Sequence, residues 1–316
     1  MSLGLGTAAL GRPQYINVKQ SKENSTQSLE DFRQKGIAVL EKAYHLGIRY
    51  FDTAPGYGLA ENLLLDWLQT KNNKNIQIAT KWGYTYVANF KTNAKVHEIK
   101  EQHSLQKLNE QWQTSKAFLP HLKVYQIHST TLETGVLENE EILNHLHALK
   151  EEHQISIGIT TTGANQAEVI KKALDVSING KQLFDAFQIT YNVLDQNLVH
   201  IAKELITYKK QVIIKEALAN ARVFRNKNYH HYNKLYAALE RLAIKYNVQV
   251  DAIALKFCQQ TIQDSIVLSG ASNDLHMESN FKMNDFKISE DEIIVLRSLK
   301  IAPQKYWDER KQLGWN

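Results

Sequence analysis

Short apolar runs alternate with longer amphipathic stretches along most of the 316-residue chain. The runs at 76–79 and 212–214 are short and rich in β-branched residues, which is typical of strands covered on both faces. The segment 29–46 instead repeats apolar residues every three or four positions, as one buried face of a helix does. The pattern predicts strands at 3–8, 50–53, 76–81, 122–128, 155–160, 184–190, 212–216 and 265–269. It predicts helices at 29–46, 60–68, 140–152, 166–174, 197–208, 235–246 and 275–281.

Eight predicted strands, most of them followed by a predicted helix, indicate an α/β chain that folds as a closed parallel (β/α)8 TIM barrel. An open doubly wound sheet is the alternative, and it normally carries the motif G-x-G-x-x-G after its first strand. The segment 4–9, Gly-Leu-Gly-Thr-Ala-Ala, has alanine at the third glycine position, and no helix pattern follows it. We therefore expect one barrel domain over residues 1–316.

Composition argues against several other classes of protein. With 43% apolar residues, 14 Gly and 4 Pro, the chain shows no disordered linker. The single cysteine, Cys258, excludes an internal disulfide framework, and its apolar neighbours predict a buried, inert thiol. The N-terminus lacks signal-peptide features, no segment has the ~18 apolar residues of a membrane span, and a net charge of +5 is spread along the chain. We expect a soluble, cytoplasmic protein that binds neither membranes nor nucleic acid.

Four polar side chains fall at the ends of three consecutive predicted strands. Asp52 ends the second strand, and a Pro-Gly turn then brings in Tyr57; Lys81 ends the third strand and His128 ends the fourth. Active sites of such barrels lie at the C-terminal ends of the strands, so these side chains should converge on one rim.

These residue types form an acid–base group suited to a carbonyl that receives hydride. Tyr57 can give its proton to the carbonyl oxygen, although a free Tyr has a pKa of about 10, and the ammonium of Lys81 should lower it. Asp52 should keep Lys81 charged and in place, while His128 should orient the substrate oxygen. Each residue also has an ordinary structural explanation, and Lys81 could instead form a Schiff base, as in aldolases.

The segment 47–61, Gly-Ile-Arg-Tyr-Phe-Asp-Thr-Ala-Pro-Gly-Tyr-Gly-Leu-Ala-Glu, resembles the pattern G-x-x-x-x-D-T-A-x-x-Y-G-x-x-E of the aldo-keto reductase family. The segments 78–81 and 125–128 resemble the strands that carry the family's lysine and histidine. The resemblance implies the barrel, a nicotinamide cofactor bound without a Rossmann domain, and the four catalytic roles given above. It also implies cofactor contacts at Gly6, Thr7, Gln188, Ser269, Gly270, Ser272, His276 and Asn280.

Three parts of the predicted cofactor site depart from the family pattern. Thr160 and Thr161 stand where members commonly have Ser-Asn against the carboxamide, and Lys215 stands at or near the place of an aromatic residue that stacks on nicotinamide. Ser272 and His276 offer no permanent charge to a 2′-phosphate. The family's habit favours NADP, and NAD stays possible.

The substrate pocket is predicted at Trp82, Tyr84 and Trp307, with the C-terminal tail 284–316 lining it and an enlarged segment at 85–122 shaping it. No metal site is expected, since His145 and His147 do not share a helix face. The prediction is an NAD(P)H-dependent oxidoreductase acting on an aldehyde, ketone or sugar. A cofactor-binding regulatory protein on the same fold, with little turnover, is the alternative. The sequence leaves oligomeric state open.

Overall fold

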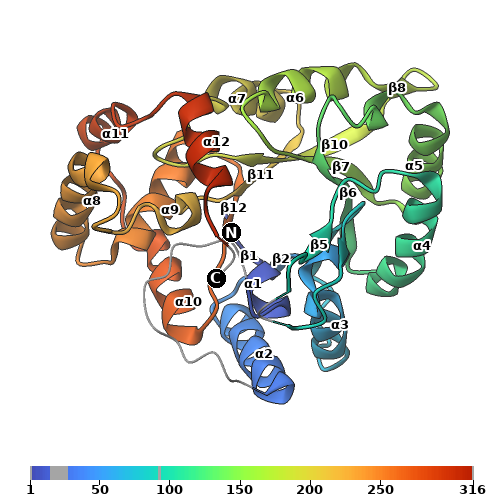
Figure 1. Ribbon diagram of the computed structural model, residues 1–316, viewed down its shortest axis with the longest axis horizontal. Coiled ribbons are helices and arrows are strands. Elements are labelled where there is room, and N and C mark those ends of the chain that lie inside the picture. Colours follow the sequence, from blue (N-terminus) through green and yellow to red (C-terminus); the bar gives the residue numbers. More distant parts are fainter. Residues whose placement is uncertain (1, 15–27, 92–93, 315–316) are drawn as a thin grey trace.

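The computed structural model describes residues 2–14, 28–91 and 94–314. Eight parallel strands close into a barrel in the order β1-β12-β11-β10-β7-β6-β3-β2, and helices ring it (Figure 1). The barrel strands are β1 (Leu3–Gly6), β2 (Tyr50–Asp52), β3 (Gln77–Trp82), β6 (Leu122–Thr130), β7 (Ser156–Thr161), β10 (Phe184–Thr190), β11 (Gln211–Lys215) and β12 (Ile266–Ser269). Each predicted strand coincides with one of them to within two residues at either end. The closed barrel is confirmed, and the open sheet is excluded.

The helices are α1 (Ala8–Gly11), α2 (Leu29–His45), α3 (Ala60–Gln69), α4 (Leu105–Ser115), α5 (Glu140–His153), α6 (Gln166–Asp175), α7 (Val199–Thr207), α8 (Asn233–Tyr246), α9 (Val250–Thr261), α10 (Asp274–Phe281), α11 (Glu290–Arg297) and α12 (Pro303–Lys311). The seven predicted helices are all present. Short 3-10 turns are η1 (Pro55–Tyr57), η2 (Lys116–Phe118), η3 (Val136–Glu138), η4 (Ala219–Ala221), η5 (His230–Tyr232) and η6 (Lys282–Asn284). Two small hairpins pair β4 (Thr85–Tyr86) with β5 (Glu98–Ile99) and β8 (Ser177–Ile178) with β9 (Lys181–Gln182).

The inside of the barrel is filled by side chains in layers. A lower layer takes buried apolar residues from six strands, namely Tyr50, Ala79, Val124, Ala186, Ile213 and Leu268. Because side chains alternate between the two faces of a strand, residues two positions further along also point inward. This places Asp52, Lys81, Gln126, Gln188 and Lys215 in the next layer towards the C-terminal ends. The barrel interior therefore changes from apolar to polar within one layer.

The outward faces of the strands pack against the helices in one large apolar core. Ile157, Ile159 and Phe187 have no exposed surface, and Trp67 on α3 is only 1% exposed. Burying such side chains stabilises the fold by roughly 1.5–3 kcal/mol each. Cys258 is buried in this layer as a free thiol, as predicted. Within the described ranges, no helix is long and apolar enough to cross a membrane.

Candidate active site

Asp52 and Lys81 form a buried ion pair in the polar layer, at the C-terminal mouth of the barrel. Their strands are parallel neighbours, so both side chains rise from the same layer. The Lys81 ammonium donates to Asp52 Oδ2 at 2.5 Å and to the carbonyl of Thr53 at 2.8 Å. The side chain of Lys81 has no exposed surface, and that of Asp52 has 3%. Such a pair is rigid, because neither charge has water as an alternative partner.

Two glutamines hold the other oxygen of Asp52. Gln188 Nε2 donates to Asp52 Oδ1 at 2.7 Å, and Gln126 Nε2 donates to it at 3.4 Å. Gln126 was missed by the sequence analysis, although it lies two residues before His128 and shares its strand face by simple alternation. Gln188, predicted as a cofactor contact, thus supports the carboxylate in this structure.

Tyr57 is placed by the turn η1 next to this pair. Gly58 follows it with φ +66°, and a Cβ there would lie 2.3 Å from the carbonyl oxygen of Gly11. The Lys81 ammonium lies 4.8 Å from the centre of the Tyr57 ring. Burial and the Asp52 carboxylate raise the pKa of Tyr57 well above its usual 10. The expected lowering of that pKa is therefore wrong, because burial and the Asp52 carboxylate both raise it. Tyr57 is a phenol that keeps its proton.

His128 completes the group from β6. Its imidazole meets the edge of the Tyr57 ring at 5.6 Å between centroids and stacks on Tyr84 at 4.2 Å. Burial lowers the pKa of His128 well below 6.5, and the charges of Lys81 and Lys215 add to this effect. The imidazole is thus neutral at physiological pH, and its buried Nδ1 has no hydrogen-bond partner. The structure brings all four predicted catalytic side chains to one rim.

The segment 85–122 forms part of the wall beside Tyr57. It contains the β4–β5 hairpin and α4, and Glu98 of β5 accepts from Arg12 Nη1 at 2.9 Å. The Arg12 guanidinium lies 5.9 Å from the centre of the Tyr57 ring. His103, further along the same segment, bonds through Nε2 to the backbone oxygen of His128 at 2.9 Å. The enlarged segment was predicted from the sequence, but the roles of Arg12 and Glu98 beside Tyr57 were not.

The predicted substrate-pocket residues lie in different places. Tyr84 stacks on His128 and is 6% exposed. Trp82 follows the inward-facing Lys81, so it faces outward into the helix-packed core and has no exposed surface. Trp307 on α12 is buried and donates from Nε1 to Asp195 Oδ2 at 3.2 Å. The last two residues of the predicted lining tail, 315–316, lie outside the described residues.

The end of β11 carries a charged cluster that the sequence analysis did not recognise. Arg310 of α12 donates from Nε and Nη2 to Glu216 Oε1 at 3.0 and 2.7 Å. Burial opposes ionisation of Glu216, but Arg310 and Lys215 outweigh it and lower the pKa of this carboxyl to about 2. The tail is thus fastened to the barrel mouth beside Lys215 by an ion pair between distant parts of the chain.

Several predicted cofactor contacts are occupied by protein partners. Thr7 donates from Oγ1 to the backbone oxygen of Asp52 at 3.0 Å, close to Gly6 at the end of β1. Thr160 Oγ1 accepts from the Ser129 backbone at 2.7 Å and keeps its own proton to donate, whereas Thr161 donates to Gln166 at 2.9 Å.

The segment after β12 is predicted to hold the adenosine end of the cofactor. Ser269 donates to Asn280 Oδ1 at 2.7 Å, and Asn280 donates to Asp251 Oδ2 at 2.6 Å, which ties α10 to β12 and α9. Ser272 Oγ and His276 Nδ1 lie 3.4 Å apart on the surface.

A phosphate-bearing cofactor fits this segment. A Cβ at Gly270 would meet nothing within 4 Å, and Gly270, Ser272 and Asp274 are exposed where the chain enters α10. The first N–H groups of a helix favour an anion there. In the mouth, His128 Nδ1 and Thr190 Oγ1 are buried without partners, so the polar groups of a ligand could satisfy them.

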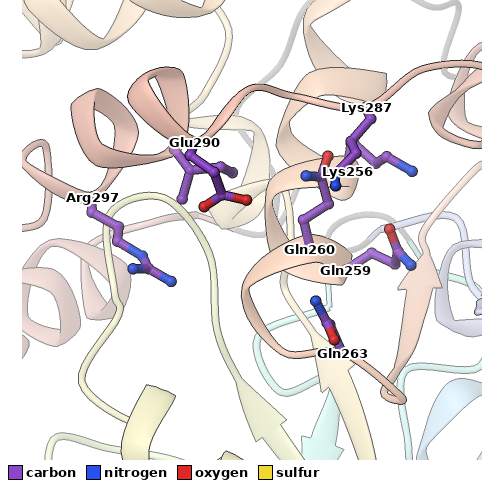
Figure 2. A pocket seen from close by; sticks show the side chains of 8 residues that line it. Lys256, Gln259, Gln260, Gln263, Lys287, Glu290 and Arg297 are labelled. Carbon is purple, nitrogen blue, oxygen red and sulfur yellow. The ribbon is translucent and has the colours of Figure 1, made fainter.

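A separate hollow of about 280 Å³ lies outside the barrel between α9 and α11. Its side chains include Lys256, Gln260, Glu290 and Arg297 (Figure 2). The nearby Gln263 comes before β12 begins, so this hollow lies towards the N-terminal end of that strand, and no catalytic candidate lines it. Among residues 2–14, 28–91 and 94–314, no group of three or more His, Cys, Asp or Glu side chains could hold a metal ion.

A parallel barrel with a buried lysine–carboxylate pair, a protonated tyrosine and a neutral histidine at its C-terminal rim has the features of a barrel oxidoreductase. A model of the aldo/keto reductase family matches residues 2–301. The chain belongs to the aldo/keto reductase family, whose members are NAD(P)H-dependent oxidoreductases.

Individual relatives are more distant. A D-threo-aldose 1-dehydrogenase from a Pseudomonas species is 39% identical over 84 residues, which make up 26% of this chain and only 21% of that protein. The oxidoreductase YqkF of Bacillus subtilis (strain 168), described as uncharacterized, is 25% identical over 297 residues, covering 86% of this chain and 89% of that one. A glycerol dehydrogenase structure from Gluconobacter oxydans superposes with a TM-score of 0.71 at 18% identity, covering 94% of this chain and 90% of that one. This likeness supports the fold alone.

Proposed function

We propose that the protein reduces the carbonyl group of an aldehyde, ketone or sugar, with Tyr57 as the proton donor and NADP as the preferred cofactor. The observation that carries the proposal is the convergence of Tyr57, His128 and the Lys81–Asp52 pair on one rim. Bound NAD(P)H supplies the hydride that the carbonyl carbon receives.

The side chains of the chain then provide the proton and the orientation. The raised pKa of Tyr57 keeps its phenol protonated, so a proton is available for the carbonyl oxygen as charge develops there. His128 is neutral and can donate one hydrogen bond to that oxygen, which orients the carbonyl. Lys81, fixed by Asp52, lies close enough to stabilise the phenolate that Tyr57 becomes after transfer. Tyr57 is partly exposed, so solvent water can return the proton to it.

The proposed contacts of the cofactor run from the mouth to α10. Thr160 has a hydroxyl proton free to donate, and Gly270 leaves open space at the end of β12. The lean towards NADP rests on the habit of the family. Ser272 and His276 lie together on the surface and could both contact a 2′-phosphate, but neither carries a permanent charge. The tail 284–316 is proposed to border the substrate, because α12 is fastened beside the mouth through Arg310.

The test is the substitution Tyr57→Phe, which removes the transferable proton and little else. We expect turnover on a panel of aldehydes, ketones and sugars to fall by about 10²- to 10⁴-fold, while the Kd for NADPH stays within a factor of about two. Aldoses belong on the panel because one relative is a D-threo-aldose 1-dehydrogenase. Tyr208→Phe, at a tyrosine that is 56% exposed on the C-terminal side of α7, is the matched control.

Two results would argue against the proposal. Retained turnover in Tyr57→Phe would exclude Tyr57 as the proton donor. Tight NADPH binding by the unaltered protein with no turnover on the whole panel would instead favour a cofactor-binding regulatory protein. Titration with NADPH and, separately, NADH, followed by quenching of Trp fluorescence, measures the cofactor preference directly.

A further inference from the structure

Lys215 contributes a second ammonium to the polar layer of the barrel. It lies two residues after Ile213, which belongs to the interior apolar layer, so its side chain also points inward. Its strand neighbour across β10 is Thr190, whose Oγ1 is buried without a partner. His128 shares the inward face of its strand with Gln126, so its side chain points towards the same interior, and the charge of Lys215 lowers its pKa.

The other charges around this space are already balanced. Asp52 is paired with Lys81, and Glu216 is paired with Arg310 at 2.7 Å. Among the described residues, no carboxylate oxygen lies within 4.0 Å of the Lys215 ammonium, and no hydrogen bond to it is formed. The mouth therefore carries one unbalanced positive charge.

The pKa of Lys215 is consistent with this surplus. Burial lowers it to about 8; Glu216 opposes the change, whereas Arg310 and Lys81 add to it. Lys215 is still protonated in most molecules at pH 7. An ammonium with a direct anionic partner would be shifted in the other direction.

The reaction brings a second charge to the same space. A carbonyl held by Tyr57 and His128 can receive hydride only if the nicotinamide ring lies about 3–3.5 Å from its carbon. The ring is neutral in the reduced cofactor and carries one positive charge in the oxidised cofactor. The phosphates and riboses of the two forms are the same. Any difference between their affinities that is caused by Lys215 must therefore come from the ring.

We propose that the ammonium of Lys215 makes the protein bind NADPH more tightly than NADP⁺, because it repels the positive charge that the nicotinamide ring carries only when oxidised. If the ring bound roughly 6–10 Å from the ammonium, with an effective dielectric constant near 20, this repulsion would correspond to a preference on the order of 10- to 100-fold. The inference rests on the proposed function and gives it a direction: the protein is loaded with reductant and releases the oxidised cofactor readily.

The experiment is equilibrium binding of NADPH and NADP⁺ by isothermal titration calorimetry at pH 7, which requires no turnover. For the unaltered protein we expect the Kd for NADP⁺ to exceed that for NADPH by at least about 10-fold. Lys215→Met, which removes the charge at similar length, should reduce this ratio by about 10-fold or more. Lys215→Arg should retain the ratio. Lys256→Met, in the hollow between α9 and α11, removes one charge far from the mouth and should leave the ratio unchanged.

Several outcomes would overturn the inference. A ratio near one in the unaltered protein refutes it without any variant, so misfolding of Lys215→Met cannot protect it. An equal loss of affinity for both forms in Lys215→Met would mean that the ammonium binds a cofactor phosphate. If Lys215→Met binds both forms and keeps the Kd ratio of the unaltered protein, this inference alone is refuted. Binding of neither form by the unaltered protein refutes the proposed function as well.

Discussion

The buried pair of Asp52 and Lys81 allows a direct prediction of stability. Lys81 has no exposed surface, and its only charged partner within 4.0 Å in the described residues is Asp52. Substituting Asp52→Asn leaves an ammonium buried without its counter-charge, which typically costs about 3–5 kcal/mol. Lys81→Met leaves the carboxylate buried, but Gln188 and Gln126 still donate to it. We expect the lower end of the same range, about 3 kcal/mol.

The double variant Asp52→Asn/Lys81→Met buries no charge. Its cost should be about 2–4 kcal/mol, from lost hydrogen bonds and altered packing, and not the 6–8 kcal/mol that the single costs add up to. The coupling energy is then about 2–6 kcal/mol. Urea unfolding at pH 7, followed by Trp fluorescence and circular dichroism, gives the four free energies of unfolding for the cycle.

A matched cycle on a surface pair provides the control. Arg33 and Asp66 form an ion pair at 2.7 Å, but their side chains are 33% and 50% exposed. Arg33→Met and Asp66→Asn should couple by only about 0.2–1 kcal/mol. If Asp52 and Lys81 coupled no more strongly than this surface pair, the argument that burial makes the two charges interdependent would be refuted.

Three further predictions concern single positions. Burial raises the pKa of Glu61 to about 7, so the unaltered protein loses stability as the pH rises from about 4.5 through 7. Between pH 5 and pH 8 the free energy of unfolding of Glu61→Gln should therefore rise by roughly 2–3 kcal/mol relative to that of the unaltered protein. The same pH dependence for both proteins in urea unfolding would contradict this. Gly58→Ala should cost at least about 2 kcal/mol and lower the Tm, because of its positive φ and the contact with Gly11; an unchanged Tm would refute the steric argument. The lowered pKa of Glu216 stabilises the fold above about pH 4.5, and this contribution is lost as the pH falls towards 2. Glu216→Gln should be less stable than the unaltered protein at pH 7. On acidification its free energy of unfolding should fall by up to about 3 kcal/mol less than that of the unaltered protein, as measured by acid unfolding. If the two proteins unfolded identically in acid, the pair with Arg310 would contribute nothing to stability.

The barrel could be predicted because its strands and most of its helices have strong, distinct periodicities. Strand ends follow directly from the apolar runs, and parallel neighbours in a closed barrel must bring Asp52, Lys81 and His128 to the same rim. The helices α1, α4, α9, α11 and α12 were not among the predicted helices; polar residues dominate α4 and α12, and α1 and α11 are only four and eight residues long. α12 is held by tertiary contacts of Tyr306, Trp307 and Arg310 that no local pattern reveals.

Electrostatics at the mouth was the least predictable part of the site. A pKa depends on burial and on every neighbouring charge, so the residue types alone suggested that Lys81 would lower the pKa of Tyr57, whereas the burial of Tyr57 and the charge of Asp52 raise it. The alternation of strand faces did contain the information that Gln126 and Lys215 point inward, because both lie two residues from an interior position. What it could not show is which charges are paired.

The pairing of charges in the polar layer has a consequence for the direction of the reaction. Asp52 and Lys81 cancel each other, and the raised pKa of Tyr57 keeps this side chain almost entirely in its protonated form at neutral pH. In the proposed function, reduction of a carbonyl takes a proton from Tyr57, whereas oxidation of an alcohol would require the phenolate. An unbalanced ammonium at Lys215 acts in the same sense, since it disfavours the charged ring of the oxidised cofactor. Two independent features of the layer thus favour reduction, and removing the charge of Lys215 should shift only the cofactor part of that bias.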